Sequence, residues 1–232
     1  MITSNGDLYM GKEKLLYQNS LEKAEDIRNF ILEGQADTSF EKGSMCLKNS
    51  LDNNLGQKAN YVLWCPETFP ENIRITWEFR PLTEIGLCIL FFAAKGRNGE
   101  DLFDPVLARR TGEYPQYHSG DINAFHISYY RRKEPEERAF HTCNLRKSYG
   151  FHLTAQGADP LPVPGDAVDF YRLTVIKFQN NIQFKINELC IFTFRDDGFT
   201  YGPLLGKGKI GFRQLAPLVA EYRNLKVYEL LT

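Results

Sequence analysis

The sequence predicts an all-β protein made of short strands arranged as a sandwich or barrel. Two observations carry this prediction: many segments of strand length alternate apolar and polar residues or run apolar throughout, and turn residues separate them. A third is that long helical periodicity is nearly absent. The predicted strands span residues 60–65, 73–80, 86–94, 124–132, 170–178, 182–187, 190–195, 209–213 and 221–230.

Two short helices are expected between these strands. The first covers residues 20–30, with Ser20 as its N-cap and acidic residues in its first turns. The second opens at Asp104, which precedes a proline at the first helical position, and residues 107–110 complete it.

Alternation within a strand assigns side chains to faces. In residues 73–80, Trp77 shares its phase with Ile75 and is expected in the core, whereas Glu78 falls on the opposite face. The phase of Trp64 is left open. Asn180-Asn181 lies between two alternating runs and is expected to supply the positive φ values of a tight hairpin.

Composition and charge limit the class of protein. The chain has 232 residues, of which 43% are hydrophobic and 25% charged, as in ordinary globular proteins. The net charge of -1 provides no general attraction to nucleic acid or to an anionic membrane. We expect one domain over residues 1–232, with residues 1–12 peripheral or disordered.

The cysteines and the N-terminus indicate a cytoplasmic protein. No apolar signal region follows Met1, and no window is long enough for a transmembrane helix. The cysteines are odd in number and form no CxxC, so buried free thiols in a reducing compartment are expected.

Two patterns resemble known families. The last third, with YRLTVIKFQNNIQFKINELCIFTFRDDG, GKGKIGFR and EYRNLKVYEL, resembles the closing half of concanavalin A-like jelly rolls. It departs from them at Asn187-Glu188, where that family often has glycine.

The middle of the chain, with WCPETFP, ITWEFRP, GLCILFFAAKGRNGEDLFDP, EYPQYHSGDINAFHISYYRRK, EERAFHTCNLRKSYGFHL and GADPLP, resembles the YesU-like family of bacterial proteins, from about residue 17 to residue 228. This resemblance implies a two-sheet antiparallel jelly-roll sandwich of the concanavalin A-like lectin/glucanase type, also described as galectin-like. It also implies a setting of carbohydrate use, without an established reaction.

Chemistry-bearing residues gather between residues 109 and 152. This window holds every histidine of the chain together with several tyrosines and arginines. In the strand 124–132, Phe125, Ile127 and Tyr129 are predicted to face the core. The opposite row, facing a groove, is predicted to be His126, Ser128, Tyr130 and Arg132. The phase of the segment around Cys143 is ambiguous.

This mixture suits sugar recognition. Aromatic faces stack on sugar rings, and arginine pairs with carboxylates, which favours uronate-containing glycans such as pectic fragments. The ligand-binding role is favoured for Arg132 and Arg146. The charged residues 133–138 are better explained as a solvated, ion-paired face.

The role of one pair of residues in this window is left open. His118 and Asp121 could form a base with its orienting carboxylate or two metal ligands, but HxxD is weak evidence and no metal site is predicted. Asn123 is expected to have a structural role at the turn.

Hydrolysis and elimination need different residues. Glycoside hydrolysis uses two carboxylates, and the candidates here are Glu78, Glu100 and Asp101. However, Glu78 is better explained as forming an ion pair with its neighbouring arginines, and no strand shows acid-x-acid spacing. Elimination instead needs a His or Tyr base and a cation that neutralises the uronate carboxylate, which this window offers.

Three hypotheses result. The first is an enzyme acting on acidic oligosaccharides, with a lyase or dehydratase favoured over a glycoside hydrolase. The others are a non-catalytic lectin-like module and an assembly protein whose sheet face pairs with a second copy. No cofactor, nucleic acid or membrane partner is expected. The candidate catalytic residues are His118, His126, Tyr130 and His152. The candidate substrate-binding residues are Arg132, Arg146, Tyr117, Asp121, Trp64 and Glu100.

Overall fold

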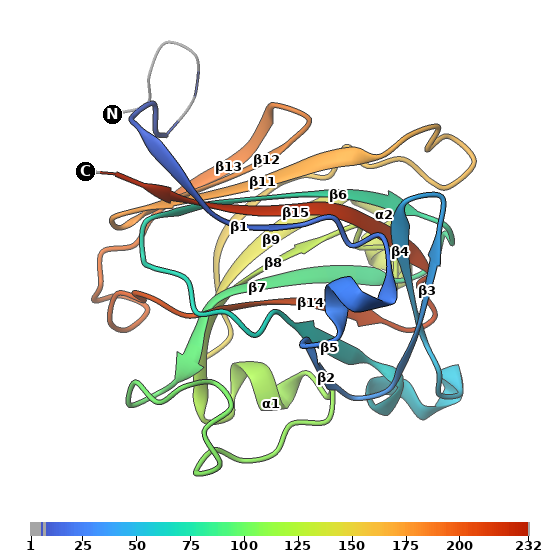
Figure 1. Ribbon diagram of the computed structural model, residues 1–232, viewed down its shortest axis with the longest axis horizontal. Helices are drawn as coiled ribbons and strands as arrows, with labels where there is room; N and C mark the ends of the chain where they lie inside the picture. Colours follow the sequence, from blue (N-terminus) through green and yellow to red (C-terminus); the bar gives the residue numbers. More distant parts are fainter. Residues whose placement is uncertain (1–5, 7, 232) are drawn as a thin grey trace.

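Two antiparallel sheets stacked face to face form the protein, as seen in the computed structural model of residues 6 and 8–231 (Figure 1). The 8-stranded sheet A has the order β13-β12-β11-β6-β15-β4-β3, and β1 also pairs with β15. The 7-stranded sheet B has the order β10-β9-β8-β7-β14-β5-β2. The two-sheet jelly-roll sandwich expected from the sequence is confirmed.

The strands of sheet A are β1 (Glu13–Asn19), β3 (Ala36–Glu41), β4 (Ser44–Asn49), β6 (Ile73–Pro81), β11 (Tyr171–Phe178), β12 (Asn181–Ile186), β13 (Leu189–Arg195) and β15 (Ala220–Leu230). Those of sheet B are β2 (Ile31–Glu33), β5 (Tyr61–Trp64), β7 (Leu87–Gly96), β8 (Ile122–Tyr129), β9 (Thr142–Ser148), β10 (His152–Ala158) and β14 (Lys209–Leu215). The helical turns are η1 (Ala24–Ile27), η2 (Asn53–Ala59), α1 (Pro115–His118) and α2 (Pro135–Ala139).

The core between the sheets follows from strand alternation. In β6 every second residue is buried, and Trp77 packs there against Phe184 of β12 and Phe212 of β14. Trp77 is fully buried, as predicted. Side chains from both sheets therefore meet in one apolar layer.

Both short-helix predictions are wrong. At the first site only η1 forms, and Lys23 precedes it, while the Ser20 hydroxyl donates to the Asp26 carboxylate. At the second, Asp104 accepts a hydrogen bond from the Val106 N–H, but the chain continues as a turn. In both places a carboxylate accepts a nearby backbone N–H, Asp26 from Glu22 and Asp104 from Val106, so the single turn is satisfied without a longer helix.

The hairpin between β11 and β12 turns one residue earlier than predicted, whereas the next hairpin turns at Asn187-Glu188 as expected. Phe178 pairs with Asn181, so the first loop is Gln179-Asn180, and its positive φ is at Gln179. In the second hairpin Asn187 and Glu188 both have positive φ, as a two-residue primed turn requires. The position that often holds glycine is thus filled without one.

The N-terminal segment is only partly described. The expectation that residues 1–12 are peripheral or disordered lies outside the described residues for 1–5 and 7. Tyr9, however, is buried against Phe178, and its hydroxyl donates to the Leu231 carbonyl. Within residues 6 and 8–231, no helix is long and apolar enough to cross a membrane.

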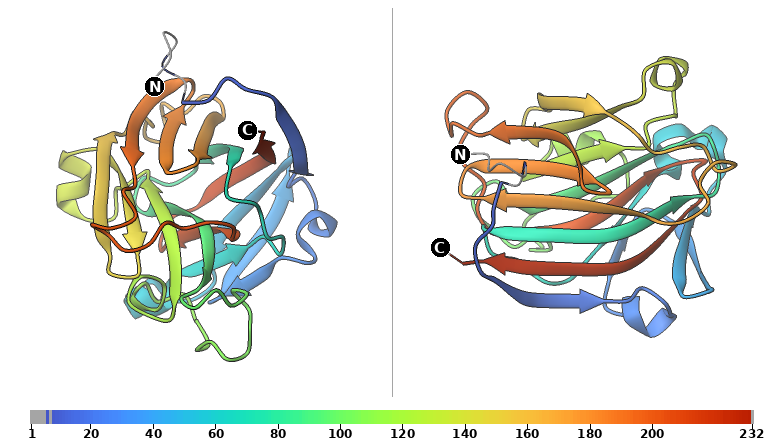
Figure 2. Two further views of the ribbon diagram at one scale, coloured as in Figure 1. Left: turned by 90° about the vertical axis from the view of Figure 1, so that its left-hand side faces the viewer. Right: turned by 90° about the horizontal axis from the view of Figure 1, so that it is seen from above.

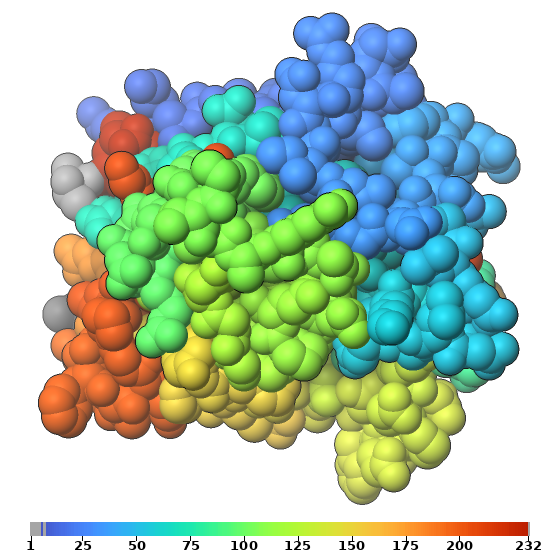
Figure 3. Space-filling view, turned by 90° about the horizontal axis from the view of Figure 1, so that it is seen from below, coloured from blue at the N-terminus to red at the C-terminus, as the bar shows by residue number. Residues whose placement is uncertain are grey.

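A second apolar layer lies on the outward face of sheet B. The segment 97–121, which includes α1, crosses this face below β7 and β8 in Figure 1. Seen from below, its green residues occupy the centre of the surface, flanked by the cyan residues of the η2 region (Figure 3). Phe91 of β7, Trp64 of β5 and Tyr117 of α1 pack together beneath it. This cover decides which polar residues of sheet B reach a ligand.

Candidate functional site

Polar side chains cluster on the outward face of sheet B where segment 97–121 ends. On β8, His126 lies opposite Phe91 of β7 and Arg146 of β9. The inward faces of β8 and β9 carry Phe125, Ile127, Tyr129, Cys143 and Leu145. The predicted division of β8 is therefore correct as far as Tyr129, and the ambiguous phase of β9 is resolved with Arg146 facing outward.

His126 is held by hydrogen bonds at both ring nitrogens. Its Nδ1 lies 2.8 Å from the Tyr114 hydroxyl, and its Nε2 lies 2.8 Å from the Ser148 hydroxyl. The ring is 1% exposed, and burial lowers the pKa of His126 well below its usual value. Burial also raises the pKa of Tyr114 to about 12. The imidazole is thus neutral, and we assign the phenol O–H as the donor to Nδ1.

Two arginines flank this pair. Arg213 of β14 is fully buried, and its guanidinium carbon lies 4.6 Å from the centre of the Tyr114 ring. Its Nη2 donates to the Gly112 carbonyl and to Gln57, but Nε and Nη1 have no partner in the described part of the chain. Burial lowers the pKa of Arg213 to about 10, which leaves it a cation at neutral pH.

Arg146 is linked to Tyr114 through Phe151, whose ring centre lies 5.4 Å from that of Tyr114. Its guanidinium stacks on the Phe151 ring at 3.8 Å and donates to the Phe151 carbonyl. The His118 ring packs on the same phenylalanine, 4.2 Å between ring centres. Neither Arg146 nor Arg213 forms an ion pair with any carboxylate among residues 6 and 8–231.

We call this cluster the Tyr114 site. Its members come from the loop before α1, from α1, from the strands β8, β9 and β14, and from the turn after β9. They are Tyr114, His118, His126, Arg146, Ser148, Phe151 and Arg213.

The prediction that Tyr130 and Arg132 continue the outward row is wrong. At Tyr130 the backbone leaves the strand with φ 49°, so the alternation ends and the ring turns into the core against Phe79. Arg132 is buried at the edge of the sandwich, where it donates to the Leu161 carbonyl and contacts His141. Neither side chain reaches the Tyr114 site.

His152 is also separated from the site. It pairs in register with Lys147, which points inward, and its ring packs 5.3 Å from Tyr201. The pairing of His118 with Asp121, which the sequence left open, does not form: His118 Nδ1 lies 2.7 Å from the Ser119 hydroxyl, and the Asp121 carboxylate accepts from the Ala108 N–H.

Three further candidates belong to segment 97–121 or to the apolar layer beneath it, and do not line an open groove. Trp64 is fully buried, and its indole N–H donates to Glu33. Tyr117 is buried beside it, with its hydroxyl accepting from the Gly112 N–H. Glu100 lies in an exposed turn, where it accepts hydrogen bonds from Asn98.

The structure gives no carboxylate pair at this face. The described strands of sheet B contain a single acidic residue, Glu33, which is bound to Arg110. Glu78 lies on sheet A and pairs with Arg223, which confirms its structural interpretation although the partner differs from its sequence neighbours. Asp101 pairs with Lys209. In the part of the chain that the structure describes, no group of His, Cys, Asp and Glu is placed to hold a metal ion.

Sequence reasoning missed four members of the Tyr114 site, which are Tyr114, Ser148, Phe151 and Arg213. Phe151 lies in the turn after β9, where strand alternation gives no signal. Arg213 alternates with the apolar residues of its strand, which was a usable signal. Tyr114 and Ser148 gave no local signal, because the first lies in a loop and the second at a strand end. Asn123 was placed correctly: it accepts a hydrogen bond from the Tyr149 N–H and so has a structural role.

Comparison with known proteins identifies relatives over almost the whole chain. The family model described as a domain of unknown function, DUF1961, matches residues 14–227. The uncharacterized protein YesU of Bacillus subtilis (strain 168) is 56% identical over 214 residues, covering 92% of this chain and 95% of YesU. The resemblance expected from the sequence is thereby confirmed.

Solved structures agree on the fold. A Bacillus subtilis protein of unknown function with a galectin-like fold superposes with a TM-score of 0.91 at 55% identity, covering 95% of this chain and 98% of that one. A non-specific endo-β-1,3(4)-glucanase of family GH16 gives 0.62 at 8% identity, covering 100% and 94%. The carbohydrate-binding module CBM66 from Bacillus subtilis gives 0.52 at 9%, covering 84% and 92%. The distant likenesses concern the fold alone, whereas the close matches show that the chain belongs to the DUF1961 family.

Proposed function

We propose that the protein binds an acidic, uronate-containing oligosaccharide at the Tyr114 site. The observation that carries this proposal is the pair of guanidinium groups, Arg146 and Arg213, that flank Tyr114 without a carboxylate partner in the described residues. A buried cation without a counter-charge is costly. A ligand carboxylate would supply that counter-charge and accept the free N–H groups of Arg213.

The surroundings of the two arginines suit a sugar more than an inorganic anion. Ser128 and Asn144 continue the outward row from β8 to β9 and supply further polar groups for hydroxyls. Several distant relatives in fold are carbohydrate-recognition domains, carbohydrate-binding modules and glucanases, which supports a carbohydrate ligand without specifying one.

Elimination is the second function that a specific observation favours. The Tyr114 hydroxyl and His126 Nδ1 are 2.8 Å apart, so the Tyr114 oxygen can take a proton from C5 of a uronate while its own proton moves to His126. The C5–H electron pair passes through the enolate to form the C4–C5 double bond as the C4–O bond breaks. The leaving oxygen takes the proton now on Tyr114, and His126 returns its proton to the phenol, so both groups regain their starting states. The flanking cations Arg146 and Arg213 would stabilise the intermediate enolate.

Hydrolysis has less support than elimination. It requires two carboxylates at the scissile bond. Sheet B offers only Glu33 among its described strands, and Arg110 already occupies that carboxylate.

Mass spectrometry and calorimetry on one panel of uronate and neutral oligosaccharides test these proposals. Binding of acidic members that is lost in Arg146→Gln, while binding of any neutral member is unchanged, supports the proposed recognition. Unsaturated fragments without a gain of water indicate elimination, whereas fragments that gain water indicate hydrolysis. If no acidic oligosaccharide binds or changes, the proposed function is wrong.

A further inference from the structure

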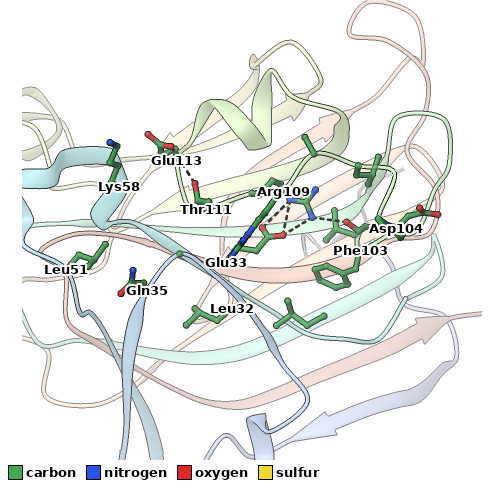
Figure 4. Close-up of a pocket in the computed structure, with 17 residues that line it drawn as sticks. Leu32, Glu33, Gln35, Leu51, Lys58, Phe103, Asp104, Arg109, Thr111 and Glu113 are labelled. Atoms are coloured by element: carbon green, nitrogen blue, oxygen red, sulfur yellow. Dashed lines mark hydrogen bonds and ion pairs between the residues drawn. The ribbon is translucent and has the colours of Figure 1, made fainter.

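A cavity separate from the Tyr114 site lies at the edge of sheet B. It has a volume of about 730 Å³ and lies between β2, the η2 region and the loop 102–113 (Figure 4). Such a volume is in the range of ligand-binding sites. Because β2 is the last strand in sheet B, its outer edge has no neighbouring strand here. Figure 2 shows the sheets from two further sides. We call this cavity the β2 pocket.

A buried ion pair lies at the centre of the β2 pocket. The Arg110 Nη2 is 2.8 Å from Glu33 Oε1, and the side chains are 4% and 9% exposed. Arg110 also donates through Nε to Glu33 and through Nη2 to the Leu102 carbonyl. Its Nη1 is buried without a partner in residues 6 and 8–231. The pocket therefore holds one group of unused donors beside a charge that is already neutralised.

The walls around this ion pair are largely apolar. In Figure 4, Leu51 and Phe103 lie on opposite sides of Glu33, and Leu32 lies below it. Leu32 is 40% exposed, which is high for a leucine in a strand. At the rim, the cations Lys58 and Arg109 are matched in number by the acids Asp104 and Glu113. The pocket thus has no excess of either charge to attract an ionic ligand.

We propose that the β2 pocket binds a neutral sugar ring. One hydroxyl oxygen of the ring would accept from Nη1 of Arg110, and its apolar C–H face would lie against Phe103 and Leu32. A carboxylate is a poorer occupant because Glu33 already neutralises Arg110, and its negative charge would lie next to the new one. The alternative of a purely apolar ligand would leave the Arg110 N–H groups unsatisfied.

This proposal does not depend on acidic recognition at the Tyr114 site, since different side chains carry it. The two sites are nevertheless close in the chain, because Glu113 at the rim of the β2 pocket directly precedes Tyr114. One glycan that contains both uronate and neutral residues would have a binding position for each.

Calorimetry with neutral monosaccharides and their uronic acid counterparts tests the β2 pocket. Leu32→Trp fills the cavity from an exposed position, and Arg110→Lys keeps a cation for Glu33 while removing the guanidinium fork. Each should weaken binding of a neutral sugar by about tenfold or more. The matched control Leu189→Trp, at a 56% exposed leucine on sheet A, should leave affinity unchanged.

Several results would overturn the proposal. These are no binding of any neutral sugar in the panel, neutral-sugar binding that survives Leu32→Trp, and a uronic acid bound in this pocket as tightly as its neutral counterpart. If Arg110→Lys does not fold, the exposed Leu32→Trp substitution decides alone. Neutral-sugar binding should persist in Arg146→Gln, so failure at one site is distinguishable from failure at the other.

Discussion

Replacing His126 by glutamine should make the protein less sensitive to acid. His126 is buried between Tyr114 and Ser148, and glutamine offers one donor and one acceptor group to the same neighbours. In the folded protein, burial holds the pKa of His126 well below its usual value, with further lowering by the charge of Arg146. In the unfolded chain the imidazole titrates normally, near pH 6.5.

The sign and size of the effect follow from proton linkage. Below about pH 6.5 the unfolded imidazole binds a proton that the folded one does not, so the free energy of unfolding falls as the pH falls. Each pH unit in this range costs about 1.4 kcal/mol. Between pH 7 and pH 5 one such histidine accounts for about 2 kcal/mol of lost stability. His126→Gln should remove this component.

Urea unfolding followed by tryptophan fluorescence at pH 7 and pH 5 measures the difference. Asp159 has a raised pKa because it is buried, and this contributes with the opposite sign, but equally in both proteins. His141→Gln is the matched control because this side chain is exposed, and it should retain the pH dependence of the wild type. If His126→Gln loses stability between pH 7 and pH 5 to the same extent as the wild type, the imidazole is not held neutral by burial.

Three further predictions concern charge and proton transfer. Arg146→Gln should weaken binding of a uronate oligosaccharide by about tenfold or more, as measured by calorimetry. The control is Arg172→Gln, because the Arg172 side chain is 60% exposed on sheet A. It should leave the affinity unchanged, and equal losses in the two variants would place the ligand elsewhere. Lys147→Met should lower the free energy of unfolding, measured in urea, by about 3–5 kcal/mol, because the Asp196 carboxylate is then buried without the ammonium group 2.7 Å away. Adding Asp196→Leu should recover most of the loss. Lys147→Met with the stability of the wild type would contradict the prediction. If elimination occurs, Tyr114→Phe should abolish unsaturated products in mass spectrometry while changing affinity by less than about threefold; persistent elimination would exclude the phenol from proton transfer.

The sequence predicted most of the strands that have neighbours on both sides, although it missed β4 and also predicted the edge strand β13. The predicted segments 73–80, 86–94 and 170–178 became β6, β7 and β11, which are interior to their sheets. Burial on one or both faces gives such strands a clear alternation or an apolar run. In contrast β1, β2 and β3 were missed, since they lie at sheet margins and many of their side chains are exposed. Where little is buried, the sequence pattern carries little information.

The site was only partly predictable because the outward face of sheet B has its own apolar cover. Alternation correctly predicted that His126 faces outward. It could not show that segment 97–121 would place the Tyr114 hydroxyl within hydrogen-bond distance of His126 Nδ1. It also could not show that Trp64, equally outward, would be sealed beneath that segment. Both outcomes depend on contacts between residues far apart in the chain, which a local pattern does not record. The positive φ at Tyr130 was equally invisible to the local pattern. Because it ends the alternation of β8, the predicted site residues Tyr130 and Arg132 lie away from the Tyr114 site.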